Sequence, residues 1–227
     1  MRGITVPTPG GPEALILGTH SLPTPQKGEI LIRVRGGGVN RPDILRRMGK
    51  PPPPAGITDI LGLEVAGKIV AAGPETPLPH PLGSRVCALV AGGGYAEYVA
   101  APVGQILPAP DTLSDAAAAA LPEGVFTVWK NLFQLGRFQV GASVLIHGGA
   151  SGIGTLAIQM ARVMGAGDIF VTCGSDEKGT ACRALGATHA INYKAEDFAS
   201  VITDKTNGRG VDIVLDMVGG DYVPRNL

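Results

Sequence analysis

The sequence predicts an α/β fold in two parts, a barrel of short strands followed by a parallel sheet covered by helices. In the first half, short β-type runs are separated by Pro and Gly, which is typical of a small barrel. From Ala142 onward, apolar strands alternate with helical patterns, which is typical of a parallel sheet. A glycine-rich turn containing Gly152 and Gly154 joins the first of these strands to its helix.

Composition excludes several classes of protein. The 227 residues carry 19 acidic and 19 basic side chains, a balance that favours neither nucleic acid nor an anionic membrane. No apolar run approaches the ~18 residues that a membrane span requires, and the first residues lack the apolar core of a signal peptide. The 3 widely spaced cysteines do not form a disulfide framework, so we expect a cytoplasmic protein.

The predicted strands of the first half are short, and each is bounded by Pro or Gly. A helix is predicted from Arg41 to Met48, with Pro42 in its first turn and Gly49 behind it. The run Pro51–Pro54 that follows predicts an extended connector. The strands are predicted at Ala14–Leu17, Glu29–Val34, Val65–Ala71, Arg85–Val90 and Tyr95–Val99.

The pattern becomes helical from Ser114, whose side chain is typical of a helix N-cap. The helix Ala116–Leu121 is expected to end at Pro122, because proline removes a backbone donor. From Phe126 to Gly136, large apolar residues recur at helical spacing, which indicates a buried stripe.

In the second half, strands and helices alternate through the sequence. The strands are predicted at Val144–His147, Asp168–Thr172, His189–Asn192 and Val211–Asp216, and the helices at Gly154–Met164, Glu177–Leu185 and Glu196–Thr203.

The turn after the first of these strands has the pattern Gly-x-Gly-x-x-Ala, the fingerprint of a dinucleotide-binding site. Gly152 is expected to allow the tight turn, Gly154 to let a pyrophosphate approach, and Ala157 to pack the helix on the strand. Exposed N–H groups at the helix start, from Ser151 through Ile153, would hold the phosphates with help from the helix dipole.

Signatures spread along the whole chain resemble one family, the zinc-free medium-chain dehydrogenases/reductases, specifically the quinone oxidoreductases of the zeta-crystallin type. The resemblance implies a GroES-like barrel with the substrate site at residues 1–124 and a Rossmann domain with the cofactor at 125–227, meeting at a cleft. The matching signatures are Gly10–Glu13, Gly38–Asp43, Leu61–Gly67, Val144–Gly152, Asn192–Tyr193 and Asp212–Gly220.

The usual Rossmann domain has six strands, and in this family the chain then returns to complete the barrel. This sequence supplies four strands and ends at Leu227, so we expect a Rossmann domain truncated after its fourth strand. A catalytically impaired fragment is therefore an alternative to a working enzyme. The homodimer of full-length relatives, which uses the last Rossmann strand, is in doubt for the same reason.

The residues do not favour zinc. Alcohol dehydrogenases of this superfamily hold zinc through a Cys where this chain has Asn40 and a His where it has Leu63. The 4 histidines have no ligand spacing, and there is no four-cysteine cluster for a structural site.

The end of the second parallel strand indicates which dinucleotide is bound. An acidic residue there would accept hydrogen bonds from the ribose of NAD, but the strand leads into Ser175. In the family, the set Ser175, Lys178 and Tyr193 holds the 2′-phosphate of NADPH, although Asp176 and Glu177 could repel it. The alternative is a helix cap, a solvated lysine and a strand-end tyrosine.

The resemblance implies an NADPH-dependent reduction of a quinone or α,β-unsaturated carbonyl by hydride transfer. It places Asn40 beside the nicotinamide and the substrate carbonyl, and Thr127 at the nicotinamide ribose and carboxamide. Alternatively, Asn40 caps the following helix and Thr127 is a buried hydroxyl. Many relatives carry a Tyr over the substrate where this chain has Pro51, so that contact is absent.

A 2-enoyl thioester reductase is the alternative enzyme. A basic patch for a phosphopantetheine or CoA phosphate would favour it, and Arg41, Arg46 and Arg47 cluster in the sequence. A solvated helix face explains the same cluster.

Overall fold

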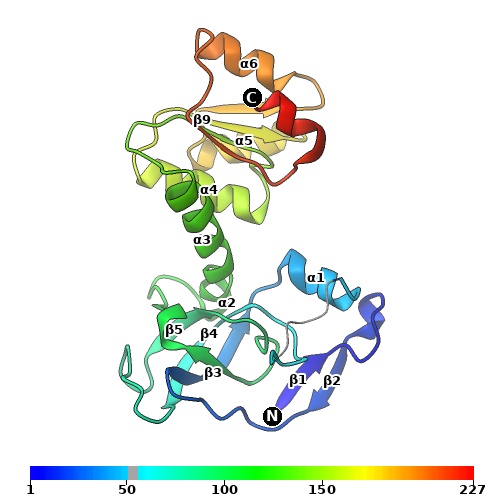
Figure 1. Cartoon of the computed structure of the whole chain (residues 1–227), viewed down its shortest axis with the longest axis vertical. Helices are drawn as coiled ribbons and strands as arrows, with labels where there is room; N and C mark the ends of the chain where they lie inside the picture. The colour runs from blue at the N-terminus through cyan, green and yellow to red at the C-terminus, as the bar shows by residue number, and fades with distance from the viewer. Residues whose placement is uncertain (51–55) are drawn as a thin grey trace. The chain divides into compact units, whose positions relative to one another are not determined.

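The computed structural model describes residues 1–50 and 56–227, and the chain divides into two compact units, Met1–Glu123 and Gly124–Leu227. Figure 1 shows strands β3, β4 and β5 in the first unit and β9 with helices α4, α5 and α6 in the second. The predicted run Pro51–Pro54 lies outside the described residues. None of the described helices is long and apolar enough to cross a membrane.

The first unit is built on a five-stranded antiparallel sheet in the order β6-β3-β4-β5-β7. Alternate residues of β3 and β4, such as Ile30, Ile32, Val65 and Ile69, point inward and are almost completely buried. A separate hairpin pairs β1 with β2. The strands are β1 (Arg2–Thr5), β2 (Ile16–Thr19), β3 (Glu29–Gly37), β4 (Glu64–Ala72), β5 (Arg85–Leu89), β6 (Tyr98–Pro102) and β7 (Ile106–Pro108).

Short helices connect the strands of this unit and lead out of it. The N-cap prediction for Ser114 is confirmed, because its Oγ accepts a hydrogen bond from Ala117 N at 3.2 Å. Pro122 opens α3, which continues without a break into a π-helix. The helices are η1 (Pro12–Ala14), α1 (Arg41–Arg47), η2 (Val103–Gln105), α2 (Asp115–Ala119), α3 (Pro122–Val128) and the π-helix η3 (Trp129–Leu135).

The second unit is a four-stranded parallel sheet in the order β10-β9-β8-β11, with apolar clusters on both faces. The strands are β8 (Val144–Ile146), β9 (Ile169–Cys173), β10 (His189–Asn192) and β11 (Ile213–Leu215), and the helices are α4 (Gly152–Val163), α5 (Asp176–Leu185), α6 (Phe198–Lys205) and η4 (Gly220–Arg225).

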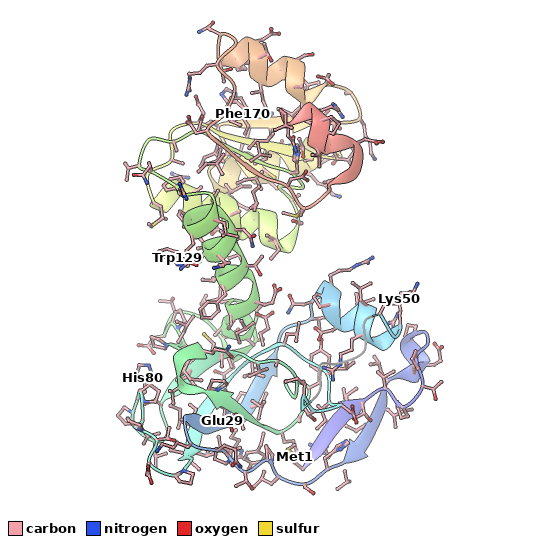
Figure 2. The ribbon with its side chains drawn as sticks, viewed as in Figure 1. Met1, Glu29, Lys50, His80, Trp129 and Phe170 are labelled. Carbon is pink, nitrogen blue, oxygen red and sulfur yellow. The ribbon has the colours of Figure 1, made fainter. Side chains whose placement is uncertain are left out.

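The two faces of this sheet are covered by different helices. Residues of α4 and α5, such as Ile158 and Cys182, pack on one face together with Leu132 of the π-helix. Phe198 of α6 packs on the other face, where Phe170 of β9 is wholly buried (Figure 2). The predicted fold class, a barrel followed by a Rossmann-type parallel sheet, is confirmed.

Some predicted boundaries are wrong for local reasons, and strands β1 and β7 were not predicted. Strand β6 starts at Tyr98, three residues later than expected, because Tyr95 N donates to Leu61 O at 2.8 Å and so ties this stretch to a loop. Helix α6 starts at Phe198, since the carboxylate of Asp197 accepts a hydrogen bond from Ser200 N at 2.8 Å and caps it.

Candidate functional site

The glycine-rich turn between β8 and α4 is held by backbone hydrogen bonds and one side-chain cap. Ser151 N donates to Gly148 O at 2.9 Å, and Ser151 Oγ accepts from Gly154 N at 3.0 Å. Gly149 N donates to Thr172 O at 2.9 Å, which fixes the turn against β9. The turn is therefore held by hydrogen bonds to its own residues and to β9.

Two backbone donors at the start of α4 remain available. The N–H groups of Gly152 and Ile153 have no hydrogen-bond partner among residues 1–50 and 56–227. The first turn of a helix leaves its N–H groups without intrahelical acceptors, and the helix dipole adds positive potential there. This end of α4 can therefore bind an anionic group such as a pyrophosphate.

The two fingerprint glycines have different steric surroundings. A Cβ on Gly154 would lie 2.3 Å from Gly148 O and 2.7 Å from Gly149 Cα, so Gly154 permits the turn to close on the helix. A Cβ on Gly152 would meet nothing within 4 Å, so no packed neighbour requires a glycine at this position. Ala157 is fully buried in the core of the unit, as predicted.

A buried histidine, which the sequence analysis did not identify as a site residue, is linked to the turn by hydrogen bonds. His147 is 0% exposed, its Nδ1 lies 3.1 Å from Thr172 Oγ1, and its Nε2 lies 2.9 Å from Asn226 Oδ1. Thr172 Oγ1 also accepts from Gly148 N at 3.1 Å, so the histidine and the turn share one hydroxyl. Burial lowers the pKa of His147, which favours the neutral ring.

The residues predicted to select the dinucleotide lie at the ends of β9 and β10. Ser175 Oγ accepts from Lys178 N at 3.4 Å and so caps α5. The Tyr193 hydroxyl would lie 2.9 Å from a Cβ on Gly174, so the ring rests against the end of β9. The hydrogen bond from Ser175 lowers the pKa of Glu177, a fully exposed carboxylate. The structure thus brings Ser175 and Tyr193 to the same end of the sheet, together with an acidic side chain.

In the first unit, Asn40 is the N-cap residue of α1, and its side chain points to a buried glutamate. Asn40 Nδ2 donates to Glu64 Oε1 at 2.8 Å. The other oxygen, Oε2, accepts from Glu123 N in the first turn of α3 at 2.9 Å. Glu64 is only 2% exposed, and burial raises the pKa of its carboxyl group despite both hydrogen bonds.

A second buried carboxylate lies on the other side of Asn40. Asp43 is 5% exposed and accepts hydrogen bonds from Asn40 N at 2.9 Å, Gly62 N at 3.2 Å and the Tyr95 hydroxyl at 2.9 Å. Burial is the main reason that the pKa of Tyr95 is raised, with the charge of Asp43 adding to it. The sequence contained a signal for both carboxylates, since Asp43 and Glu64 lie inside the matching signatures.

Thr127 lies in α3 and is half-buried. Its backbone carbonyl accepts a hydrogen bond from Asn131 Nδ2 at 2.9 Å. Thr127 belongs to the second unit and Asn40 to the first, so the structure describes each predicted catalytic residue within its own unit.

The donor set does not fit a zinc ion. Over residues 1–50 and 56–227, no group of three or more His, Cys, Asp or Glu side chains could hold a metal. Asn40 Nδ2 is a hydrogen-bond donor toward Glu64, and a donor N–H group does not bind a cation. Cys87, Cys173 and Cys182 are buried, free thiols.

The predicted cluster of arginines on α1 is largely engaged. Arg46 Nη2 donates to Thr58 O, and Arg47 Nε donates to Gly10 O at 3.2 Å. These hydrogen bonds tie α1 to the neighbouring loops, so two of the three arginines contact the protein itself and not only solvent.

Comparison with known proteins gives two family matches. The family of alcohol dehydrogenase GroES-like domains matches residues 26–111, and the family described as zinc-binding dehydrogenase matches residues 152–227.

Two similar proteins of Mycobacterium tuberculosis are much longer synthases. The chain is 35% identical over 217 residues, 96% of its length, to a phthioceranic/hydroxyphthioceranic acid synthase. It is 32% identical over 224 residues, 99% of its length, to a component of the phenolphthiocerol/phthiocerol polyketide synthase. The chain spans about a tenth of the length of these relatives, 10% in each case.

Solved structures match nearly the whole chain. The CurK enoyl reductase superposes with a TM-score of 0.89 at 32% identity, over 99% of this chain and 69% of that one. A quinone oxidoreductase of Escherichia coli complexed with NADPH superposes with a TM-score of 0.86 at 29% identity, over 100% of this chain and 69% of that one. The chain therefore belongs to the zinc-binding dehydrogenase family of medium-chain dehydrogenases/reductases, nicotinamide-dinucleotide oxidoreductases with a GroES-like and a dinucleotide-binding domain.

Proposed function

We propose that this chain reduces a quinone or an α,β-unsaturated carbonyl compound with NADPH, without zinc. The observation that carries this proposal is the start of α4, where the N–H groups of Gly152 and Ile153 are unpaired within the described residues and a Cβ on Gly152 would meet nothing within 4 Å. The bound dinucleotide would supply the hydride. The protein's contribution is to bind, orient and polarise, because no nucleophile or metal is needed for this chemistry.

The choice of NADPH is supported by the end of β9. The Ser175 and Tyr193 hydroxyls and the Lys178 ammonium group are the kinds of donor that bind a 2′-phosphate. Glu177 opposes this choice, because its carboxylate interacts with Ser175 and would repel a second anion. The similar E. coli quinone oxidoreductase was solved with NADPH.

Asn40 and Thr127 are proposed to act on the reacting groups. One N–H of the Asn40 amide is used by Glu64, and the second would donate to the carbonyl oxygen of the acceptor. Such a donor stabilises the negative charge that develops on that oxygen during hydride transfer. The Thr127 hydroxyl would contact the nicotinamide ribose and carboxamide, and so orient the ring.

A 2-enoyl thioester is the second candidate substrate. It is supported by the similarity to the CurK enoyl reductase and to the mycobacterial polyketide synthase. The arginines of α1 give it less support, because Arg46 and Arg47 donate to backbone carbonyls of the unit itself.

The first test is titration of the 227-residue chain with NADPH and NADH, followed by nicotinamide fluorescence. We expect NADPH to bind at least about tenfold more tightly, the effect of one charge-assisted hydrogen bond. Oxidation of the reduced cofactor is then measured with a benzoquinone, an enone and a 2-enoyl N-acetylcysteamine thioester. Failure to bind either dinucleotide would contradict the proposal, and turnover of the thioester alone would select the second candidate.

A further inference from the structure

Two buried carboxylates hold Asn40 from two directions. Asp43 binds its backbone N–H at 2.9 Å, and Glu64 binds its side-chain Nδ2 at 2.8 Å. A helix cap requires only local hydrogen bonds within the first turn. The bond to Glu64 joins residues 24 positions apart and therefore serves another purpose than starting α1.

The Glu64 carboxylate has little freedom to move. Each of its oxygens accepts one hydrogen bond, from Asn40 Nδ2 and from Glu123 N. The side chain also lies directly against Gly38, where a Cβ would approach Glu64 Oε1 to 1.9 Å. Packing and hydrogen bonding together fix the position of Oε1.

An ionised carboxylate can only accept hydrogen bonds, whereas the two ends of an amide are a donor and an acceptor. With Glu64 ionised, Asn40 must turn Nδ2 toward it and Oδ1 away from it. We propose that Glu64 is a positioning residue that fixes the orientation of the Asn40 amide. It thereby decides whether the N–H group or the oxygen of that amide meets the acceptor. The part that concerns turnover rests on the proposed function of Asn40.

Protonation of Glu64 would release this constraint. A proton on Oε1 can donate to Asn40 Oδ1, so Glu64 would then accommodate either orientation of the amide. The titratable groups that face Glu64 are Asp43, Glu123, Cys87 and Tyr95. None of these is a cation, and burial with the charges of Glu123 and Asp43 raises the pKa of Glu64. As pH falls, the constraint from Glu64 should therefore be lost at a higher pH than the one at which an ordinary glutamate becomes protonated.

The test uses the ¹H–¹⁵N signals of the Asn40 side-chain amide, identified by their loss in Asn40→Asp. In the unmodified chain, we expect this pair to shift with pH as Glu64 ionises. In Glu64→Gln, the new amide can accept from Glu123 N and donate to Asn40 Oδ1, so the pair should be displaced and insensitive to pH over that range. Glu97→Gln is the matched control, because Glu97 is an exposed glutamate of the same unit bound to Arg2.

Catalysis gives an independent readout. Glu64→Gln should lower kcat about tenfold, the effect of one weakened hydrogen bond in the transition state, and leave the Kd for NADPH unchanged. An Asn40 pair that titrates normally in Glu64→Gln would overturn the proposal. If the signals behave as expected but no acceptor is reduced by any variant, the proposed function fails while the positioning of Asn40 stands.

Glu64→Asp covers the case in which Glu64→Gln does not fold. It keeps the charge and withdraws the carboxylate by one methylene group, out of reach of at least one of its two donors. The Asn40 pair should again be displaced, and an unchanged pair would overturn the proposal.

Discussion

The two units hold their candidate site residues by different means. In the parallel-sheet unit, the turn before α4 is shaped by backbone hydrogen bonds and by glycines that allow close approach, such as Gly154. In the barrel unit, Asn40 is held by the side chains of Asp43 and Glu64, both buried carboxylates. A backbone site is encoded locally, whereas a side-chain network is encoded by residues far apart in the sequence.

The difference predicts different sensitivities to substitution. The turn should be disrupted when a methyl group is added at Gly154. Substitution of the other side chains of the turn should lower the free energy of unfolding less. The hydrogen bonds that hold Asn40 should be lost when a carboxylate is moved or neutralised, because a buried polar group then has no partner.

The largest effect is expected for Gly154→Ala. The added methyl would lie 2.3 Å from a backbone oxygen, so the turn must open. We expect a loss of about 3 kcal/mol in the free energy of unfolding, as for severe overpacking, together with loss of detectable dinucleotide binding. Urea unfolding and fluorescence titration measure these two quantities.

Gly152→Ala is the matched variant for the same turn. Its methyl would meet nothing within 4 Å, so the free energy of unfolding should not fall. Dinucleotide binding should weaken, because the methyl adds bulk at the residue that carries one of the two unpaired N–H groups. Equal loss of stability in both variants would contradict the different roles assigned to the two glycines.

In the barrel, Gly38→Ala tests the carboxylate network without altering a charge. The methyl would approach Glu64 Oε1 to 1.9 Å and displace it from Asn40. We expect a loss of about 2 kcal/mol in the free energy of unfolding, since overpacking adds to a lost buried hydrogen bond. Gly104→Ala, where a Cβ meets nothing within 4 Å, should be close to neutral in the same thermal or urea unfolding experiment.

Lys178→Ala should have a smaller effect that is confined to one ligand. Removal of an exposed cation near the expected 2′-phosphate should weaken NADPH binding by about tenfold and leave NADH binding unchanged. Lys205→Ala, at the last residue of α6, is the control. Equal losses for both dinucleotides, measured by fluorescence titration, would remove Lys178 from the phosphate site.

The smallest effect is the pH dependence contributed by His147. Burial lowers the pKa of its ring in the folded state, so the unfolded chain binds a proton at a higher pH. The contribution to stability is complete above the ordinary histidine range and is lost as pH falls through the lowered pKa. Thermal unfolding over this range should show a weaker acid dependence in His147→Gln. If the dependence of the melting temperature on pH is the same in His147→Gln, other titratable groups dominate the acid dependence of stability.

Sequence patterns predicted the fold well because they encode local geometry. Alternating apolar runs identified β3, β4 and all four parallel strands, and Ser114 was recognised as a cap. The sequence missed what depends on distant partners. The link between Asn40 and Glu64 spans 24 positions, and the support of His147 by Asn226 spans 79. No local periodicity reports such contacts.

The steric surroundings of Gly152 and Gly154 are a second feature that the sequence did not predict. The fingerprint identifies which positions must be small, but only the three-dimensional path of the turn decides what each missing side chain would strike. Gly154 faces the protein backbone, and Gly152 faces open space.

The thioether of Met217 adds a chemical vulnerability to this turn. Its sulfur lies 3.4 Å from Ser151 Oγ, a Cβ on Gly148 would lie 3.5 Å from it, and the residue is 42% exposed. Peroxide can reach such a side chain and convert it to a sulfoxide, which is larger and a stronger hydrogen-bond acceptor. The new oxygen would accept a stronger hydrogen bond from the Ser151 hydroxyl, whose oxygen also accepts from Gly154 N, and would bring extra bulk against the turn. Oxidation of a single methionine would therefore change the contacts of the turn before α4, and a methionine sulfoxide reductase would reverse that change.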